Sequence, residues 1–415
     1  MNKVSIITLG CKQNKYESDC MAEVLSRNGY EVIDTLEYAD IYVLNTCAVT
    51  NEAEKKSRQH IIKFNKLNPN AKIIVCGCAS ENNLEQFKNK ENVFAIIGTE
   101  NKQSILDLID NAIMQKYPIP LEYNSPVLPQ KTTTREYLKI QDGCNNFCSY
   151  CIIPYLRGRS RSRALEDILS EARILSQRSK EIVLTGIDIS DYRINGKKAL
   201  PILMQELSSI PALIRLGSLE VGVINIELLE TLRSMPNFAP HFHLSLQSGD
   251  DSVLKRMNRH YSAQEFYDKT RLILQYFPNA NLTTDVIVGF AGETEEEFIN
   301  TRDFIEKVGF SFVHIFPYSR RDGTLSSKLY KDLPSAIKKE RVDRLEEVNA
   351  RLKENYLNRF IGKSSRMLVE EKKEYWEGFS PEYIRCYYNG NVASGDLINI
   401  KFVKRYKDGL IVEKI

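Results

Sequence analysis

Residues 143–151 read Gly-Cys-Asn-Asn-Phe-Cys-Ser-Tyr-Cys, which places Cys144, Cys148 and Cys151 in a C-x3-C-x2-C spacing. A closed structural zinc site uses four ligands in tetrahedral geometry, and this loop supplies three thiolates. Three thiolates on one short loop suit an iron–sulfur cluster whose fourth iron is left open to a ligand from outside the protein. The alternatives are a zinc knuckle and a reduced cysteine-rich loop without metal.

Strand-like and helix-like stretches alternate around and after this loop. Six such βα units fall short of the eight of a closed barrel, so we expect an incomplete (βα)6 barrel with a lateral opening for a macromolecular substrate. The expected strands are 137–141, 181–185, 214–219, 241–246, 282–288 and 312–317.

The N-terminal part of the chain also alternates between strands and helices, which predicts a Rossmann-like parallel sheet. Cys11, Cys47 and Cys78 each follow one of its first three expected strands. The carboxyl ends of parallel strands lie at one edge of a sheet, so we predict that these three cysteines converge as a second three-thiolate site. The alternative is that they are buried core cysteines. The expected strands are 4–9, 41–45, 73–76 and 93–97.

The C-terminal segment changes character after Gly362, where short alternating strands are separated by turns. This pattern predicts a small antiparallel β-barrel, a shape that often contacts RNA. A proline-rich stretch reads as a linker between the first two domains. The predicted division of this α/β chain is therefore 1–115, a linker over 116–132, 133–361 and 362–415.

The composition is that of an ordinary globular protein of two or three domains, with 415 residues and a net charge of +3 from 57 basic and 54 acidic residues. The nine cysteines, with no export signal and no apolar run of about 20 residues, predict a reducing, cytoplasmic location and no membrane span. Four arginines directly after the cysteine loop are expected to contact RNA phosphates, the alternative being a solvated turn. They are Arg157, Arg159, Arg161 and Arg163.

The ends of the later expected strands carry residues suited to a cofactor pocket. Each could equally serve a structural turn or strand end. These residues are Gly186, Glu220, Gln247 and Asp285.

The C-x3-C-x2-C loop resembles that of radical S-adenosylmethionine enzymes, and the whole chain resembles the methylthiotransferase family within them. The resemblance implies that Cys144, Cys148 and Cys151 hold a [4Fe-4S] cluster that cleaves S-adenosylmethionine to a radical, with Tyr150 near the adenine. It implies an auxiliary [4Fe-4S] cluster at Cys11, Cys47 and Cys78 that presents sulfur, and a terminal barrel of the TRAM type. The matching motifs are Leu9–Asn14, Asn45–Thr50, Gly77–Ala79, Lys56–Gln59, His243–Gly249 and Phe316–Ser319.

Within that family, the residues after Cys11 look most like the branch that acts on threonylcarbamoyladenosine 37 of tRNA. The implied partners are the tRNA anticodon loop, an electron donor such as flavodoxin or ferredoxin, and a sulfur source. The alternatives are the isopentenyladenosine branch, the branch acting on a ribosomal-protein aspartate, and a non-catalytic, metal-stabilised RNA-binding protein. The chain departs from the common family pattern at Val221, Ala291 and residues 320–324.

Overall fold

The computed structural model describes residues 2–123 and 134–415 and divides into two compact units. The first comprises Met1–Lys131, Lys139–Ala164 and Ser319–Thr324, and the second comprises Thr132–Leu138, Leu165–Tyr318 and Leu325–Ile415. The cysteine loop at 143–151, expected in the central domain, therefore belongs to the compact unit of the N-terminal residues. The predicted boundary at 132/133 and most of the predicted linker lie outside the described residues.

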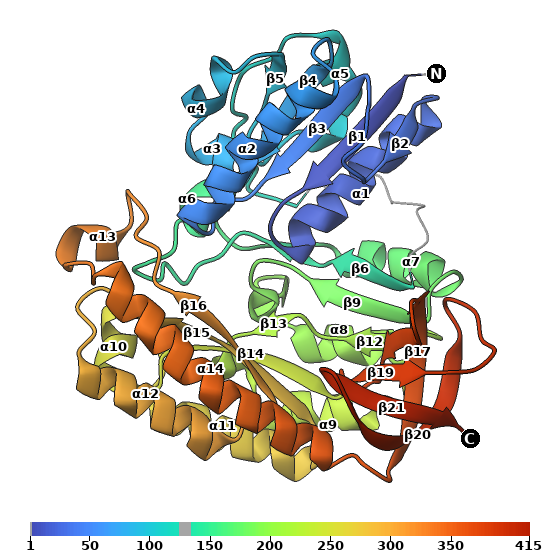
Figure 1. The fold of residues 1–415 in the computed structure, drawn as a ribbon, viewed down its shortest axis with the longest axis vertical. Coiled ribbons are helices and arrows are strands. Elements are labelled where there is room, and N and C mark those ends of the chain that lie inside the picture. The colour runs from blue at the N-terminus through green and yellow to red at the C-terminus, as the bar shows by residue number, and fades with distance from the viewer. Residues whose placement is uncertain (1, 124–133) are drawn as a thin grey trace. The chain divides into compact units, whose positions relative to one another are not determined.

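The first unit contains the predicted Rossmann-like sheet, with five parallel strands in the order β2-β1-β3-β4-β5 (Figure 1). Its central strand β3 is buried along its whole length, as expected of a parallel strand covered on both faces. Tyr42 and Leu44 pack in one hydrophobic core, while Ile41 and Val43 pack in the other. The elements are β1 Lys3–Thr8, α1 Lys12–Arg27, β2 Glu31–Ile33, β3 Ile41–Thr46, α2 Asn51–Leu67, β4 Lys72–Gly77, α3 Cys78–Asn82, α4 Glu85–Lys88, β5 Val93–Ile96 and α5 Ile105–Asp110.

The cysteine loop of the first unit is closed by a short antiparallel pair, β7 Gln141–Asp142 with β8 Arg161–Ser162. Helix α6, Ile153–Arg157, follows the last cysteine. Ile152 and Leu156 are buried in the same hydrophobic core as Cys78. Apolar burial thus anchors the end of this loop to the N-terminal sheet.

The second unit contains the predicted parallel strands in two sheets, ordered β12-β9-β6 and β13-β14-β15-β16. The expected third strand, 214–219, is divided at Leu216-Gly217, where a Cβ on Gly217 would lie 2.7 Å from the Leu184 carbonyl oxygen. The strands are β6 Arg135–Lys139, β9 Glu181–Thr185, β12 Leu213–Arg215, β13 Ser218–Leu219, β14 His241–Gln247, β15 Asn281–Val288 and β16 Phe312–Pro317. The helices are α7 Leu165–Ser176, α8 Leu200–Leu207, α9 Ile226–Ser234, α10 Asp251–Arg256, α11 Ala263–Tyr276, α12 Glu295–Val308, α13 Leu325–Leu329 and α14 Ser335–Asn358.

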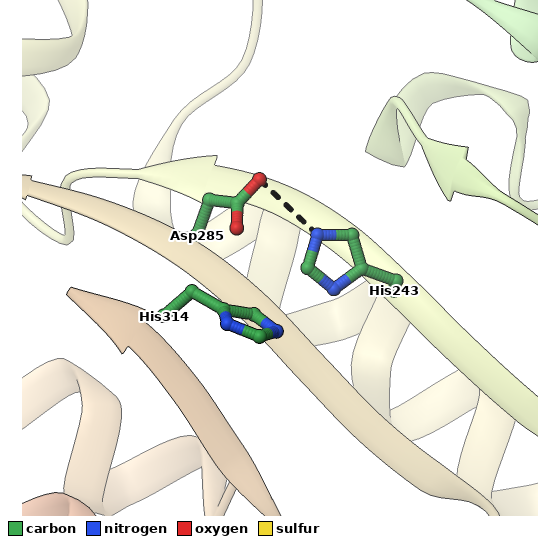
Figure 2. A group of neighbouring side chains, drawn as sticks. All are labelled: His243, Asp285 and His314. Carbon is green, nitrogen blue, oxygen red and sulfur yellow. Dashed lines mark ion pairs between the residues drawn. The ribbon is translucent and has the colours of Figure 1, made fainter. Parts of the chain in front are cut away.

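The two faces of the second sheet differ in chemistry. Along β14, Phe242, Leu244 and Leu246 are buried, whereas His243, Ser245 and Gln247, which alternate with them, are more polar and partly exposed. His243, Asp285 and His314, from three adjacent strands, point to one another on the polar face (Figure 2).

The predicted C-terminal barrel is present, but it is mixed rather than antiparallel. Its strands close in the order β17-β18-β19-β21-β20, and β19 pairs with β21 in parallel. In a closed ring of five strands, neighbouring strands cannot all run in opposite directions because five is odd. One parallel pair is therefore required when the barrel closes without an open edge. The strands are β17 Ser364–Lys372, β18 Trp376–Phe379, β19 Arg385–Tyr388, β20 Leu397–Tyr406 and β21 Gly409–Lys414.

Buried charge joins this barrel to the rest of the second unit. The Arg215 side chain is 1% exposed and donates from Nε to Glu181 Oε1 at 2.6 Å and from Nη1 to the Pro381 carbonyl oxygen at 2.9 Å. Arg135 bridges Glu181 and Glu370, each at 2.9 Å. Within the described part of the chain, no helix is both long enough and apolar enough to cross a bilayer.

Candidate functional site: two cysteine trios in one unit

The structure brings Cys11, Cys47 and Cys78 to the carboxyl edge of the N-terminal sheet. Cys47 follows β3, Cys78 follows β4, and Cys11 lies between β1 and α1. A Cβ added to Gly10 would lie 2.8 Å from Cys47 Sγ, so the loop carrying Cys11 passes directly over the Cys47 thiol. This placement agrees with the predicted convergence of three thiols.

The turn that presents Cys78 is held by backbone geometry and by one hydroxyl group. Gly77 has a φ of 104°, and a Cβ there would lie 2.5 Å from the Thr46 carbonyl oxygen. Thr46 Oγ1 donates to the Cys76 carbonyl oxygen at 2.7 Å and accepts from the Ala79 N–H at 3.1 Å. β4 can therefore turn into α3 at this point only with glycine before Cys78.

Asn14 ties together the loop ends that carry the other two cysteines. Its Nδ2 donates to the Leu9 carbonyl oxygen at 2.8 Å and to the Thr46 carbonyl oxygen at 2.9 Å. Asn14 Oδ1 accepts from Arg157 Nη2 at 2.8 Å. Arg157, which follows Cys144, Cys148 and Cys151 in the chain, thus contacts the residue that holds the loops of Cys11 and Cys47.

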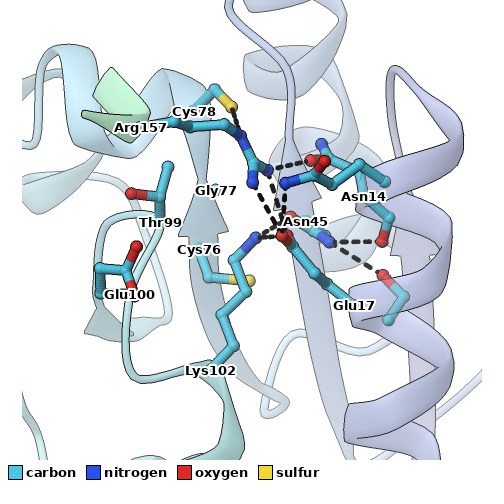
Figure 3. A network of polar contacts seen from close by, with 12 residues as sticks. Asn14, Glu17, Asn45, Cys76, Gly77, Cys78, Thr99, Glu100, Lys102 and Arg157 are labelled. Carbon is cyan, nitrogen blue, oxygen red and sulfur yellow. Dashed lines mark hydrogen bonds and ion pairs between the residues drawn. The ribbon is translucent and has the colours of Figure 1, made fainter. Parts of the chain in front are cut away.

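Arg157 is the centre of this polar network and is 1% exposed (Figure 3). Its Nε donates to Cys78 Sγ at 3.3 Å, and its Nη1 donates to Glu17 Oε1 at 2.8 Å and to Asp142 Oδ2 at 3.2 Å. Lys139 Nζ joins the same two carboxylates, at 2.9 Å and 2.7 Å. A buried arginine directed at a sulfur atom is the arrangement that stabilises a thiolate.

Burial and charge act in opposite directions in this network. Burial alone would raise the pKa of Glu17, and the charges of Arg157, Lys102 and Lys139 instead hold it well below its ordinary value. Burial would lower the pKa of Arg157, but Cys78 and the two carboxylates hold it well above its ordinary value. The network is therefore ionised at neutral pH.

The cysteine donors fit a metal cluster. Burial raises the pKa of Cys47 to about 11, and it also raises the pKa of Cys78. Buried thiols of this kind are deprotonated when a metal supplies the compensating positive charge. Three soft sulfur donors and one hydrogen-bond donor to sulfur suit an iron–sulfur cluster.

Cys144, Cys148 and Cys151 lie partly exposed on the loop between β7 and α6. The Asn146 N–H lies 3.4 Å from Cys144 Sγ, and the Cys151 N–H donates to the Cys148 carbonyl oxygen at 3.0 Å. These contacts fold the loop back on itself beside its thiols. Such a loop suits a cluster in which one iron has no ligand from the protein. Tyr150, predicted near the adenine, is half-buried on the same loop.

Three of the four arginines expected to bind RNA are buried, which contradicts that expectation for them. Arg157 belongs to the network above. Arg161 donates to the Pro120 carbonyl oxygen at 3.0 Å and pairs with Glu100, while Arg163 is 2% exposed. Arg159 alone of the four is exposed, and its guanidinium lies 4.3 Å from the Phe147 ring centroid.

The remaining predicted pocket residues lie in the second unit, at or near strand ends. Gly186 follows β9, Gln247 ends β14 with a φ of 66°, and both are half-buried. Glu220 forms an ion pair with Arg259, and Asp285 forms one with His243. These pairings show that both carboxylates already have a partner within the protein.

The sequence interpretation missed Asn14, Glu17 and Lys139 as parts of the site. A signal for the first two exists in α1, where Asn14 is buried and Glu17, one turn later, has a side chain only 11% exposed. For Lys139 the chain carries no comparable local signal.

Comparisons with known proteins agree with this geometry. Residues 3–98 match the Uncharacterized protein family UPF0004, and residues 138–305 match the Radical SAM superfamily. The threonylcarbamoyladenosine tRNA methylthiotransferase MtaB of Aquifex aeolicus is 36% identical, over 96% of this chain and 99% of its own length. The chain belongs to the radical S-adenosylmethionine methylthiotransferase family.

Relatives in this family differ in the substrate that their names state. The MtaB protein of Bacillus subtilis is 35% identical over 100% of this chain and 97% of its own length. The tRNA-2-methylthio-N(6)-dimethylallyladenosine synthase of Thermodesulfovibrio yellowstonii is 31% identical over 98% of this chain and 97% of its own length. Among solved structures, the radical S-adenosylmethionine methyltransferase TsrM from Kitasatospora setae is similar in fold, with a TM-score of 0.58, 11% identity, and coverage of 79% of this chain and 77% of that one.

Proposed function

We propose that this protein transfers a methylthio group to carbon 2 of N(6)-threonylcarbamoyladenosine at position 37 of tRNA. The observation that carries the proposal is the presence of both cysteine trios in one compact unit, where Arg157, six residues after Cys151, donates to Cys78 Sγ. The choice of substrate is supported by relatives named MtaB that are about 36% identical over their full length.

In this proposal the two trios have separate tasks. Cys144, Cys148 and Cys151 would hold a [4Fe-4S] cluster with S-adenosylmethionine, while Cys11, Cys47 and Cys78 would hold an auxiliary [4Fe-4S] cluster. When bound, the first group would supply the radical that removes a hydrogen atom from an unactivated carbon. The auxiliary cluster would supply the sulfur that is transferred to that carbon. Arg157 would orient Cys78 and balance the charge of the bound thiolates, while Asn14 keeps the loops of Cys11 and Cys47 at a fixed separation.

The proposed macromolecular partner is the anticodon loop of tRNA. Arg159, the exposed arginine of the cysteine loop, is the residue of the basic run that can reach a phosphate. The chemistry further requires a low-potential electron donor, such as flavodoxin or ferredoxin, and a source of sulfur. A reducing, cytoplasmic location would keep the thiols available.

Tyr150, Gly186, Gln247, Glu220 and Asp285 remain proposed contacts of the cofactor. The internal ion pairs of Glu220 and Asp285 imply that each would have to share its carboxylate with the cofactor. An isopentenyl-type substrate is the second candidate, favoured by the relative of 31% identity that is named for dimethylallyladenosine.

The experiment is nucleoside analysis of total tRNA from cells that lack the protein. We expect the 2-methylthio derivative of threonylcarbamoyladenosine to disappear from the tRNA. Threonylcarbamoyladenosine without the methylthio group should accumulate instead. Loss of the isopentenyl derivative instead would assign the second substrate, and an unchanged nucleoside profile would contradict both.

A triple Cys11→Ala, Cys47→Ala and Cys78→Ala variant tests the division of tasks. Relative to the wild-type chain, it should bind about four fewer irons after anaerobic reconstitution. It should still cleave S-adenosylmethionine with reductant, and it should fail to restore the modification. Unchanged iron content would refute the auxiliary site, and absence of 5'-deoxyadenosine from the wild-type protein would favour a non-catalytic, metal-stabilised RNA-binding protein.

A further inference from the structure

A third group of potential ligands lies in the second unit and contains no cysteine. His243 is on β14, Asp285 on β15 and His314 on β16, three adjacent parallel strands. Asp285 is the register partner of His314, and His243 is the partner of Thr283, two residues before Asp285. Residues two apart on a strand share a face, so all three side chains emerge on the same side of the sheet (Figure 2).

The donor atoms of the three side chains are close to the spacing of a metal site. One donor atom from each residue can be chosen so that all three lie within 4.8 Å of one another, and His243 Nε2 lies 3.1 Å from Asp285 Oδ2. Ligands about 2.1 Å from a zinc-like ion lie roughly 3.0–3.4 Å apart. The first pair already has this separation, and the exposed His314 offers a ring nitrogen within 4.8 Å of both, so a change of its side-chain torsions can complete the set.

The second nitrogen of His243 has a fixed partner. His243 Nδ1 lies 2.9 Å from Thr283 Oγ1, and the same hydroxyl lies 2.9 Å from His241 Nε2. In one orientation the Thr283 hydroxyl donates to His241 and accepts from the Nδ1–H of His243, which leaves the Nε2 lone pair directed at the Asp285 carboxylate. In this tautomer the two acceptors, 3.1 Å apart, are held together by a positive charge between them, either a proton or a metal ion.

We propose that this charge is a divalent transition-metal ion bound by His243, Asp285 and His314. Two imidazoles and one carboxylate suit Zn²⁺, Fe²⁺, Mn²⁺ or Co²⁺ and leave coordination positions open on the exposed side. The Thr283 hydroxyl acts as the outer partner that ligating histidines characteristically have. The site lies in the second unit, whereas both cysteine trios lie in the first, so this ion is additional to the iron–sulfur clusters.

The test uses the full-length protein with both clusters reconstituted and oxidised, a state in which [4Fe-4S]²⁺ gives no paramagnetic signal. Mn²⁺ is titrated anaerobically, and free Mn²⁺ is followed by its six-line paramagnetic resonance spectrum. We expect one Mn²⁺ per chain, displaced by Zn²⁺ in line with the general affinity order. Asp285→Asn and His314→Ala should each weaken binding at least tenfold. His260→Ala, an exposed histidine of the same unit, should bind like the wild-type protein.

Absence of stoichiometric binding would overturn the proposal and leave a proton between His243 and Asp285. If Asp285→Asn and His314→Ala bind Mn²⁺ as tightly as the wild-type protein, the proposed metal site is also overturned. Iron content and S-adenosylmethionine cleavage are measured on the same samples. Because S-adenosylmethionine cleavage by the wild-type protein tests the cysteine trios and Mn²⁺ binding tests the histidines, failure of the metal site is distinguishable from failure of the proposed enzyme activity.

Discussion

At the scale of single residues, Arg157 shows how burial changes the meaning of a charge. In the sequence it opens a basic run that resembles a phosphate-binding segment, yet in the structure it has a thiol, two carboxylates and an amide as partners. Removing one member of a buried charged network leaves the others uncompensated, at a cost of about 3–5 kcal/mol.

Arg157→Met should therefore lower the free energy of unfolding by about 3–5 kcal/mol. It should also reduce iron uptake at the auxiliary site, because Cys78 loses its hydrogen-bond donor. Urea unfolding followed by circular dichroism, with iron analysis after reconstitution, measures both effects. Arg159→Met is the matched control, since Arg159 is exposed and should change stability by less than about 1 kcal/mol. Equal effects of the two substitutions would contradict the central role of Arg157.

The ionised carboxylates of the same network predict sensitivity to acid. The pKa of Glu17 in the folded protein lies well below its ordinary value of about 4.3, so the folded state binds fewer protons than the unfolded state. This stabilisation is fully present above the unfolded pKa and is lost as pH falls below it.

We expect the melting temperature to drop steeply between about pH 5 and pH 3. Glu17→Gln should melt lower at neutral pH but with a shallower acid slope, whereas Glu91→Gln, at an exposed position, should keep the wild-type slope. Identical slopes for Glu17→Gln and the wild-type protein would remove Glu17 as the cause.

At the scale of elements, the turn from β4 into α3 decides where Cys78 lies. Gly77→Ala forces a Cβ to 2.5 Å from the Thr46 carbonyl oxygen and adds strain at a φ of 104°. Gly29→Ala adds comparable strain at a φ of 84°, but its Cβ meets nothing within 4 Å.

Both substitutions should destabilise the chain by about 1–2 kcal/mol through backbone strain, and Gly77→Ala should cost more because its Cβ also meets the Thr46 backbone. Only Gly77→Ala should also lower iron content, by up to about four atoms per chain, because only that turn carries a cysteine ligand. Iron analysis of the two reconstituted variants measures the difference. Full iron loading of Gly77→Ala would show that the auxiliary site tolerates movement of Cys78.

The elements were largely predictable because their signals are local. Alternating strands and helices indicated the parallel strands of both units, and turn residues indicated the C-terminal strands. The short edge strand β2 escaped prediction because three half-exposed residues carry little pattern. The division of 214–219 and the parallel pair β19–β21 depend on distant contacts and on closure of a ring, which no local pattern reports.

At the scale of the whole molecule, the barrel and the core of the second unit are linked by Arg135 and Arg215, which both form ion pairs with Glu181. Arg215→Met should lower the free energy of unfolding by about 3–5 kcal/mol, because Glu181 and the Pro381 carbonyl oxygen lose a buried donor. Arg193→Met is the matched control: Arg193 pairs with Asp191 at 2.7 Å, but its side chain is 41% exposed, so the loss should stay below about 1 kcal/mol. Urea unfolding of both variants measures the two losses, and equal losses would contradict the bridging role of Arg215.

The candidate site was predictable only in part at this scale. The six cysteines could be proposed as ligands because thiolate spacing is a property of short segments and of strand ends. The compensating charges could not, since Glu17, Lys139 and Arg157 come from helix α1, strand β6 and helix α6, which are up to 140 residues apart. Their pairing is a consequence of tertiary packing, as is the burial of Arg161 and Arg163.

The origin of Arg157 bears on how the auxiliary site matures during synthesis. The segment matching UPF0004 ends at residue 98, yet the ions that neutralise Glu17 include Lys139 and Arg157. A nascent chain released only to residue 98 would hold the thiols of Cys11, Cys47 and Cys78 beside an uncompensated Glu17. We therefore expect the isolated N-terminal segment to take up the proposed cluster poorly until residues 139–157 have been synthesised.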